Sequence, residues 1–380
     1  MKGLIALAVL RLALKLDLGP EYDTNANRAE TVDGVVNIDH PTGSALLRTT
    51  TRLSLAWQSG ASLLRVSGGL GAKVFFNPAV FDQDTLVGQL GVDERVTLGR
   101  FVDFGLTSDY YDAGQLDVAP PCAAAGCNRH RDFRSGSSTV RLSLIDALGD
   151  LTFLGGWRGF QYKPDAEYDF EAAQASVVAN FHTRAGAERN HEIGLVAGYH
   201  LERRWFSGSA DLLSPSCSPE SPCIEPGSSE RLDWFHETSI EVSYVGPVLV
   251  TAGYDLQLND SNSYDQSLTR HIVTLRLAAR LPWQLYATLK GQIIKTLYLH
   301  RVPLATDTQT CQCIEDENRN SLIADLERPI GKTGLSVEAR YSFYTNELGS
   351  TTVHFTRHVI YLGLTYKAGW RLGKTAPPPP

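Results

Sequence analysis

The sequence lacks any apolar run long enough to form a transmembrane helix. No stretch of ~18 consecutive apolar residues occurs in the 380-residue chain, although a helix needs about 20 such residues to cross a bilayer. The chain is also short of positive charge, since its formal net charge is −7 and charged residues make up only 20% of it. Because nucleic-acid-binding surfaces are normally basic, no nucleic-acid partner is predicted.

The sequence has none of the short motifs that mark common enzymes. It contains no G-x-S-x-G, no H-E-x-x-H and no phosphate-binding loop. Its ten histidines are scattered along the chain with no serine or aspartate at a fixed spacing. The sequence therefore predicts neither an enzyme nor a cofactor, and no catalytic residues are assigned.

What the sequence does contain is alternation of apolar and polar residues with a period of two. In the stretch LSVEARYSF, the apolar Leu335, Val337 and Tyr341 alternate with Glu338 and Arg340. Such alternation is typical of a β-strand with one apolar and one polar face. Sixteen segments of this kind occur, at residues 10–23, 45–58, 61–76, 84–97, 100–113, 133–145, 149–162, 167–183, 190–205, 231–245, 247–260, 266–281, 283–298, 318–328, 332–346 and 352–367.

The lengths of these segments and of their connections favour a membrane barrel over a soluble sandwich. Strands of globular proteins typically have about 5–6 residues, whereas a strand that crosses a bilayer needs ~9–11. Short turns also tend to alternate with longer loops along the chain, which is the pattern of outer-membrane barrels. The sequence therefore predicts an all-β fold, a transmembrane antiparallel up-and-down β-barrel of about 16 strands in the outer membrane. Both chain ends and the short turns would lie on the periplasmic side.

The chain divides into three predicted parts. Residues 1–9 carry a lysine and a short apolar run, as a signal peptide does, but no A-x-A cleavage site follows, so we interpret them as a remnant of one. Residues 10–367 form the barrel. Residues 368–380 form a proline-rich periplasmic tail.

All six cysteines fall in three of the long predicted loops. An even number of cysteines in an exported protein suggests disulfides, and we predict that Cys122 pairs with Cys127 and Cys217 with Cys223. Cys311 and Cys313 are separated by one residue, so a bridge between them would be strained, and their state stays open. Because these spacings differ from those of zinc sites, no metal is predicted.

The polar faces of the predicted strands supply the candidate functional residues. An outward charge in the bilayer costs about 2–4 kcal/mol for Lys or Arg, so charged residues are expected to line the lumen. The lumen-lining residues that we assign are Arg276, Arg280, Lys290, Asp325, Glu327, Glu338, Arg340 and Arg357. Both signs are interleaved along the chain, which predicts a wall network without strong selectivity for anions or cations.

Aromatic residues lie near the predicted strand ends, where girdles at the membrane interface would need them. These are Trp57, Phe76, Tyr110, Tyr111, Trp205, Trp234, Phe235, Trp283, Tyr298 and Tyr344. Trp and Tyr prefer the headgroup zone, which favours girdle placement. An aromatic stack for sugars inside the lumen is the alternative.

The C-terminal region resembles outer-membrane β-barrel porins of Gram-negative bacteria. The resemblance covers residues 316–366, in particular the strand LSVEARYSFYTN and the last strand TRHVIYLGLTY, and it extends to GPEYDTNANR at residues 19–28. It implies the barrel fold. Barrels of this type accompany exopolysaccharide secretion or envelope machines, so the resemblance implies such partners as well.

Together these observations predict an outer-membrane β-barrel channel. Its expected cargo is a polysaccharide or another polar solute, and its partners are outer-membrane lipid and a periplasmic secretion or motility complex. The alternative is a structural outer-membrane component of an envelope complex such as gliding-motility or adhesion machinery.

Overall fold

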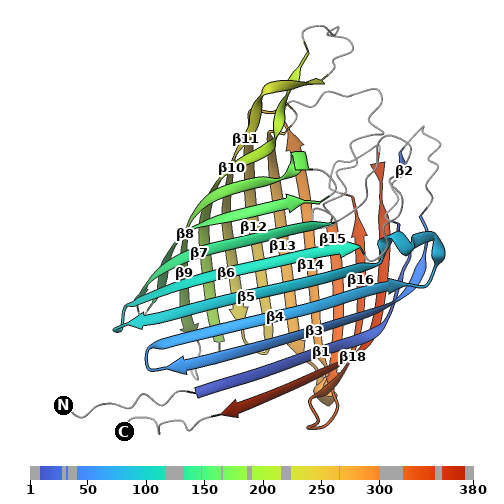
Figure 1. The fold of residues 1–380 in the computed structure, drawn as a ribbon. Helices are drawn as coiled ribbons and strands as arrows, with labels where there is room; N and C mark the ends of the chain where they lie inside the picture. The colour runs from blue at the N-terminus through green and yellow to red at the C-terminus, as the bar shows by residue number, and fades with distance from the viewer. Residues whose placement is uncertain are drawn as a thin grey trace.

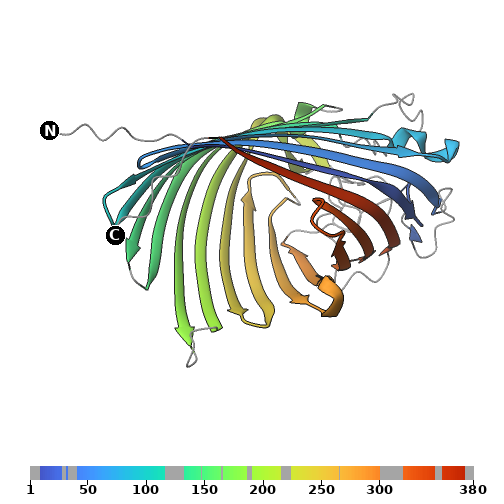
Figure 2. The same ribbon diagram turned by 90° about the horizontal axis from the view of Figure 1, so that it is seen from below.

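The computed structural model describes most of the chain as one closed β-barrel of sixteen antiparallel strands (Figure 1). The residues described are 9–27, 31–32, 41–115, 132–146, 148–163, 166–185, 191–214, 224–264, 266–299, 320–346 and 353–372. Figure 2 shows the strands wrapping around the interior when the barrel is seen from the end that carries the termini. The predicted fold class and strand number are confirmed.

The barrel strands follow the chain around the ring, and the first strand pairs with the last. Their bounds are β1 Val9–Asp23, β3 Ser44–Ser59, β4 Ser62–Phe75, β5 Thr85–Leu98, β6 Val102–Gln115, β7 Phe133–Asp146, β8 Gly149–Tyr162, β9 Phe170–Ala185, β10 His191–Leu213, β11 Ile224–Val245, β12 Val248–Ser261, β13 Leu268–Arg280, β14 Tyr286–Tyr298, β15 Asn320–Pro329, β16 Leu335–Thr345 and β18 Thr356–Leu372. The strands β2 (Thr31–Val32) and β17 (Val353–His354) form a separate two-stranded sheet.

Among the described residues, three short 3₁₀ helices lie in the connections between strands, namely η1 (Pro78–Gln83), η2 (Ala166–Tyr168) and η3 (Pro282–Gln284). None of the helices among the described residues is long and apolar enough to cross a membrane. The hairpin of β10 and β11 extends beyond the predicted segments and rises above the rest of the barrel (Figure 1). Strand β18 continues to Leu372, so the structure places residues 368–372 in that strand rather than in the tail.

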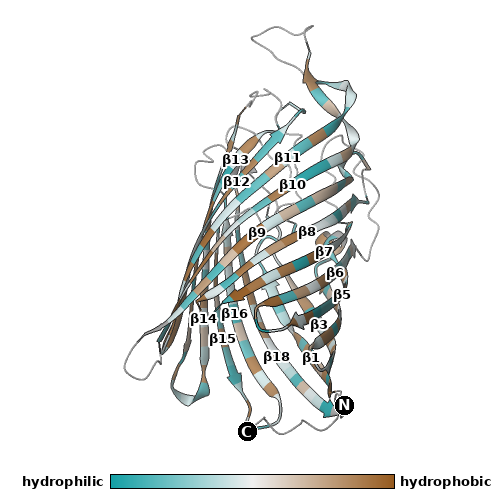
Figure 3. Cartoon of the chain, turned by 90° about the vertical axis from the view of Figure 1, so that its left-hand side faces the viewer, coloured by the Kyte–Doolittle hydropathy of each residue, from teal (hydrophilic) through white to brown (hydrophobic). Residues whose placement is uncertain are grey.

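The two faces of each strand differ in polarity, as the alternation along the strands in Figure 3 shows. The large apolar side chains of one face are exposed, for example Leu275 at 45% and Leu362 at 55%. The other face carries the charged residues, several of which are buried, such as Glu202 and Asp233. Side chains crowd together on a concave wall and diverge on a convex one, so the polar face lines the interior and the apolar face is the outer one. An apolar outer band is what contact with lipid requires.

The two ends of the barrel differ in their connections. The short turns lie at the end where both chain termini emerge (Figure 1). Gly60 and Gly99 occupy two of these turns with φ of 57° and 75°, a left-handed conformation that residues with a Cβ adopt only at a cost. In outer-membrane barrels the short turns are periplasmic, so the opposite end of the barrel is the extracellular one.

A small apolar cluster lies inside the extracellular mouth. Leu46 and Phe75 belong to the inner faces of β3 and β4, and Val80 of η1 packs with them and with Ala26. All four are at most 4% exposed. The segment with η1 is therefore folded inward over this part of the wall.

Candidate functional site

The inner wall of the barrel is the candidate site, because it carries most of the charged residues of the strands. All eight residues assigned to the lumen lie on the polar face. Arg276 and Arg280 belong to β13, Lys290 to β14, Asp325 and Glu327 to β15, Glu338 and Arg340 to β16, and Arg357 to β18. Their positions match the alternation, while their role in a conducting lumen stays a prediction.

Ion pairs connect several of these residues. Arg340 donates to Asp325 at 3.3 Å and also contacts Glu338. Glu327 does not pair with its cross-strand neighbour Glu338 but accepts a hydrogen bond from Lys367 at 2.7 Å. These pairs hold β15, β16 and β18 together and leave little free charge on this part of the wall.

Arg276 and Lys290, in contrast, are not part of this set of ion pairs. They are cross-strand neighbours on β13 and β14, and no ion pair of either is found within the described part of the chain. Two adjacent cations without a counter-ion make this part of the wall locally positive, so an anionic group of a passing solute would be attracted here.

Charges of opposite sign also face each other across the barrel. Strands β1, β3 and β4 are each eight places from β10, β11 and β12 in the ring of sixteen, so the two groups are opposite. On the first wall, with β18, Lys15, Glu21 and Asp23 are among the inner-face residues that form ion pairs, and the inner-face charges without an ion pair in the described part of the chain are Arg11, Arg52, Arg65 and Arg371. On the second wall, Arg204 pairs with Glu202 and Arg231 with Asp233, while Glu237, Glu241 and Asp255 have no ion pair among the described residues. The unpaired charges of the two walls therefore differ in sign, and a field across the lumen follows from this arrangement.

A buried network fixes the wall near the extracellular mouth. Arg357 of β18 donates to both carboxylate oxygens of Asp23 of β1, the shortest contact being 2.6 Å. Glu21, which is 3% exposed, accepts from Lys73 at 2.8 Å and from Arg48 at 3.3 Å. These bonds join the first and last strands to β3 and β4, so the network closes the ring at its upper end.

A ladder of aromatic rings lies on the inner wall at the extracellular end of β6 to β10. The ring of Tyr111 stacks on Phe133 with centroids 5.2 Å apart, and Phe133 stacks on Phe160 at 5.4 Å. Phe160 stacks on Phe170 at 5.3 Å, and Phe170 contacts Phe206 at 5.1 Å. Five strands thus contribute one ring each to a continuous row, which we call the aromatic ladder.

Arginine side chains border the aromatic ladder. The guanidinium of Arg231 lies 4.0 Å from the ring centroid of Phe206, and those of Arg158 and Arg204 lie 5.5 Å from that of Phe170. Buried Glu202 accepts from Arg204 at 2.6 Å and lies 3.7 Å from Arg158. Arg158 and Arg204 are thereby held in place by one carboxylate, while Arg231 donates to Asp233, and all three guanidinium groups cover part of the rings.

The prediction of aromatic girdles is wrong for some residues. Tyr111, Phe235 and Tyr344 share the inner face, where they contact Phe133, Arg204 and Arg357, respectively. Trp205 and Trp234 lie on the outer face, where both rings contact Arg203. Four members of the aromatic ladder were not predicted, namely Phe133, Phe160, Phe170 and Phe206. Each of them falls on the same face of its strand as the polar residues, which was the available signal.

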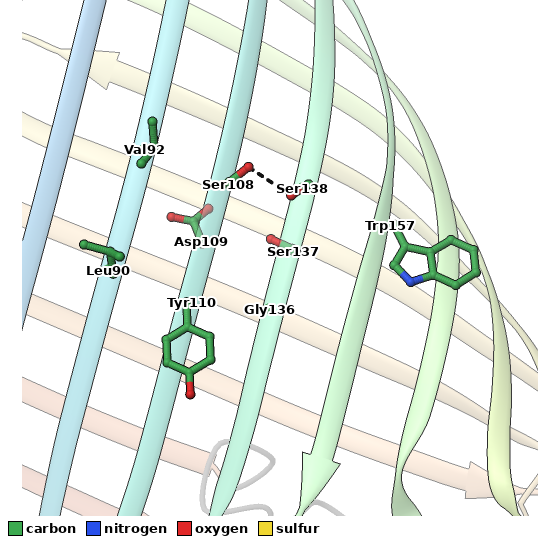
Figure 4. A pocket seen from close by; sticks show the side chains of 9 residues that line it. All are labelled: Leu90, Val92, Ser108, Asp109, Tyr110, Gly136, Ser137, Ser138 and Trp157. Carbon is green, nitrogen blue, oxygen red and sulfur yellow. Dashed lines mark hydrogen bonds between the residues drawn. The ribbon is translucent and has the colours of Figure 1, made fainter.

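The outer face carries a shallow depression of about 300 Å³ over β5 to β8 (Figure 4). Leu90, Tyr110 and Trp157 border it, and the hydroxyls of Ser108 and Ser138 hydrogen-bond each other at 2.9 Å on its floor. Because the two hydroxyls satisfy each other, they can face lipid at low cost. This depression belongs to the outer surface and is separate from the lumen.

The predicted disulfides cannot be compared with the structure, because Cys122, Cys127, Cys217 and Cys223 lie outside the described residues. The same holds for Cys311 and Cys313. Within the described ranges, no group of three or more His, Cys, Asp or Glu side chains is arranged to hold a metal ion.

No family model matches the chain, and no curated protein matches it. Solved structures of outer-membrane proteins align with it over almost its whole length. OmpT of Vibrio cholerae has 13% identity and a TM-score of 0.41, covering 97% of this chain and 99% of its own. OprD of Pseudomonas aeruginosa has 9% identity and a TM-score of 0.42 over 96% and 94%. OccAB1 of Acinetobacter baumannii has 10% identity and a TM-score of 0.49 over 94% and 96%.

The assignment of this protein to a structural class rests on the features of its own barrel. The ring of sixteen strands is closed, its outer face is apolar, and its inner face is charged. A closed barrel leaves no strand edge with unpaired backbone groups in the bilayer, which is the condition for crossing it with strands. The protein is a transmembrane β-barrel of the kind found in outer membranes.

Proposed function

We propose that the protein is a passive channel for a polar solute across the outer membrane. The observation that carries the proposal is the closed ring of sixteen strands with a polar inner wall. A ring of this size is wide enough for an aqueous lumen, whereas about eight strands leave room only for side chains or a small ligand. Passive diffusion along a wet wall needs neither a catalytic group nor a cofactor.

The solute class that we propose is a saccharide, in the form of a secreted polysaccharide or of a shorter chain. Partners in this reading are outer-membrane lipid, which the apolar outer face fits, and a periplasmic secretion complex. Export of a polymer would be driven from the periplasm, because the barrel itself has no energy source.

Conductance of the purified barrel in a planar bilayer tests the channel. We expect steady single-channel currents, because charged side chains such as Arg276 and Lys290 keep the inner wall hydrated. The recording is repeated with a reductant, which would open disulfides among the predicted loop cysteines. Absence of current in both conditions would contradict the channel proposal.

Measurements of ion selectivity test whether the opposite charges of the two facing walls act on passing ions. Replacing Glu241 and Asp255 with glutamine and asparagine removes two negative charges and leaves the cationic wall unchanged. A unit charge contributes ~1 kcal/mol at close range in water, so the ratio of cation to anion permeability should fall by up to about fivefold. Reversal potentials in a salt gradient measure this ratio. The double replacement of Arg52 and Arg65 with glutamine is the matched control, and it should shift the ratio in the opposite direction.

One observation favours the alternative of a structural barrel in an envelope complex, such as motility or adhesion machinery. The segment with η1 folds inward at the mouth, where Val80 packs on Leu46 and Phe75. A barrel narrowed by its own segments could serve as a scaffold. In that case the bilayer would show no current, and capture of a periplasmic complex by the assembled barrel would be the supporting result.

A further inference from the structure

A pocket lies on the inner wall directly below the aromatic ladder. It has a volume of about 300 Å³ and is formed by β6, β7, β8 and β9. Its lining consists of Asp109, Tyr111, Ser135, Gly136, Ser137, Thr139, Arg158 and Gln174. Tyr111 belongs both to this pocket and to the first position of the ladder, so the two features are continuous.

The register fixes the depth of the pocket in the lumen. Tyr111 pairs with Ser135, and Asp109 pairs with Ser137, which is two residues further from the extracellular end of β7. Ser137 pairs in turn with Arg158 of β8. A solute that enters from the outside therefore meets the rings first and the polar groups second.

The polar groups of the pocket include donors and acceptors in one small volume. Arg158 provides donors only, the ionised carboxylate of Asp109 accepts only, and the serine and threonine hydroxyls do both. Asp109 is exposed to the lumen and has no ion pair within the part of the chain that the structure describes. Gln174 donates to Thr139 at 3.2 Å, and its amide oxygen is a further acceptor of the pocket.

This combination selects a class of ligand. A simple anion would be repelled by Asp109, and a simple cation by Arg158. An apolar molecule would leave Asp109 without a partner and would remove the polar atoms of the pocket from water, which costs free energy. A neutral molecule with many hydroxyls satisfies donors and acceptors together, and its C–H faces can pack on aromatic rings, which combine an apolar body with low conformational entropy.

We propose that the pocket and the aromatic ladder form a binding subsite for a neutral saccharide. The rings of Tyr111, Phe133 and Phe160 contact the C–H faces of the sugar units, while Asp109, Arg158 and Gln174 hydrogen-bond their hydroxyls. The proposal deepens the channel proposal and rests on it for its biological use, although binding itself can be measured without transport.

The primary test is calorimetric titration of the detergent-solubilised barrel with neutral hexasaccharides. The probes are maltohexaose, cellohexaose and chitohexaose, with a polyethylene glycol of equal hydrodynamic radius as the ringless control. The detergent must lack a sugar headgroup, because a glucoside would compete for the subsite. We expect saturable binding of at least one hexasaccharide and none of the polymer.

Substitutions then test whether the saccharide binds at the proposed subsite. Phe160→Ala should weaken binding roughly two- to tenfold, which corresponds to the ~0.5–1.5 kcal/mol of an aromatic contact. Asp109→Asn keeps the shape of the side chain but removes its charge, and should also weaken binding. Phe153→Ala is the matched control, because Phe153 lies on the outer face of the same strand and is 40% exposed. It should leave the affinity unchanged.

The outcomes separate this proposal from the channel proposal. Binding by no hexasaccharide, or equal affinity of Phe160→Ala, Asp109→Asn and Phe153→Ala, overturns the subsite even if the barrel conducts. Binding that depends on Phe160 and Asp109 supports the subsite even if the bilayer shows no current. In a conducting barrel, the same saccharide should also interrupt the current in a saturable manner.

Discussion

Replacing Leu275 with arginine is expected to prevent assembly of the barrel in the membrane. Leu275 lies on the outer face near the middle of β13, and its cross-strand neighbours are Ala252 and Gly291. These small neighbours offer no counter-charge, so the guanidinium would face lipid. An arginine near the bilayer midplane costs about 2–4 kcal/mol, which is a large share of the ~5–15 kcal/mol that stabilises a typical fold.

The matched control is Thr274→Arg, one residue away on the inner face. Thr274 lies between Gly253 and Gln292 across the neighbouring strands, so its arginine would reach the lumen. Tyr361, on the inner face of β18, is a poorer control because it is 3% exposed and lies under Arg48 and Arg340. The measurement is the folded fraction in outer-membrane preparations, from mobility on unheated gels. Equal yields of the two variants would contradict the assignment of the faces.

The strands could be predicted from the sequence because each carries its own period-two pattern. A lipid-facing side chain and a lumen-facing one alternate without exception over the middle of β13, as Val273, Thr274 and Leu275 illustrate. The upper parts of β10 and β11 were missed because their sequences, FSGSADLL and IEPGSSE, have no alternation. They pair with each other above the ring, with irregular register near Ser209 and Asp211, where no lipid demands an apolar face.

The site could be predicted only in part, since it depends on which strands become neighbours. The parity within a strand identifies inner residues such as Arg276, but it does not say what lies across the lumen. The aromatic ladder brings together Tyr111 and Phe206, which are far apart in sequence, through four successive registers. The separation of the unpaired charges onto opposite walls likewise appears only once the ring is closed. The signal available in the sequence was an aromatic residue on a polar face, as at Phe160.

Removal of the Asp23 carboxylate is expected to cause the second large effect. Asp23→Ala leaves the guanidinium of Arg357 buried without its main counter-ion, since the side chains of the two residues are 0% and 7% exposed. Removing one partner of a buried ion pair typically lowers the free energy of unfolding by about 3–5 kcal/mol. The substitution also removes the acceptor for the backbone N–H of Asn25, so the turn that follows β1 is weakened as well. Urea unfolding of the barrel in detergent measures the loss.

Two further variants test whether the loss of stability comes from the burial of the remaining charge. Glu327→Ala breaks the pair with Lys367, which is 51% exposed, and should cost less than about 1 kcal/mol because water solvates the remaining charge. The double variant Asp23→Leu with Arg357→Met removes both charges at similar volume and should recover most of the stability, because no charge is then left buried. The two residues are separated by 334 positions in the chain. Full recovery would mean that the loss in Asp23→Ala comes from the unpaired buried charge of Arg357, whereas persistent loss would mean that the hydrogen bonds of the pair themselves hold the closed ring together.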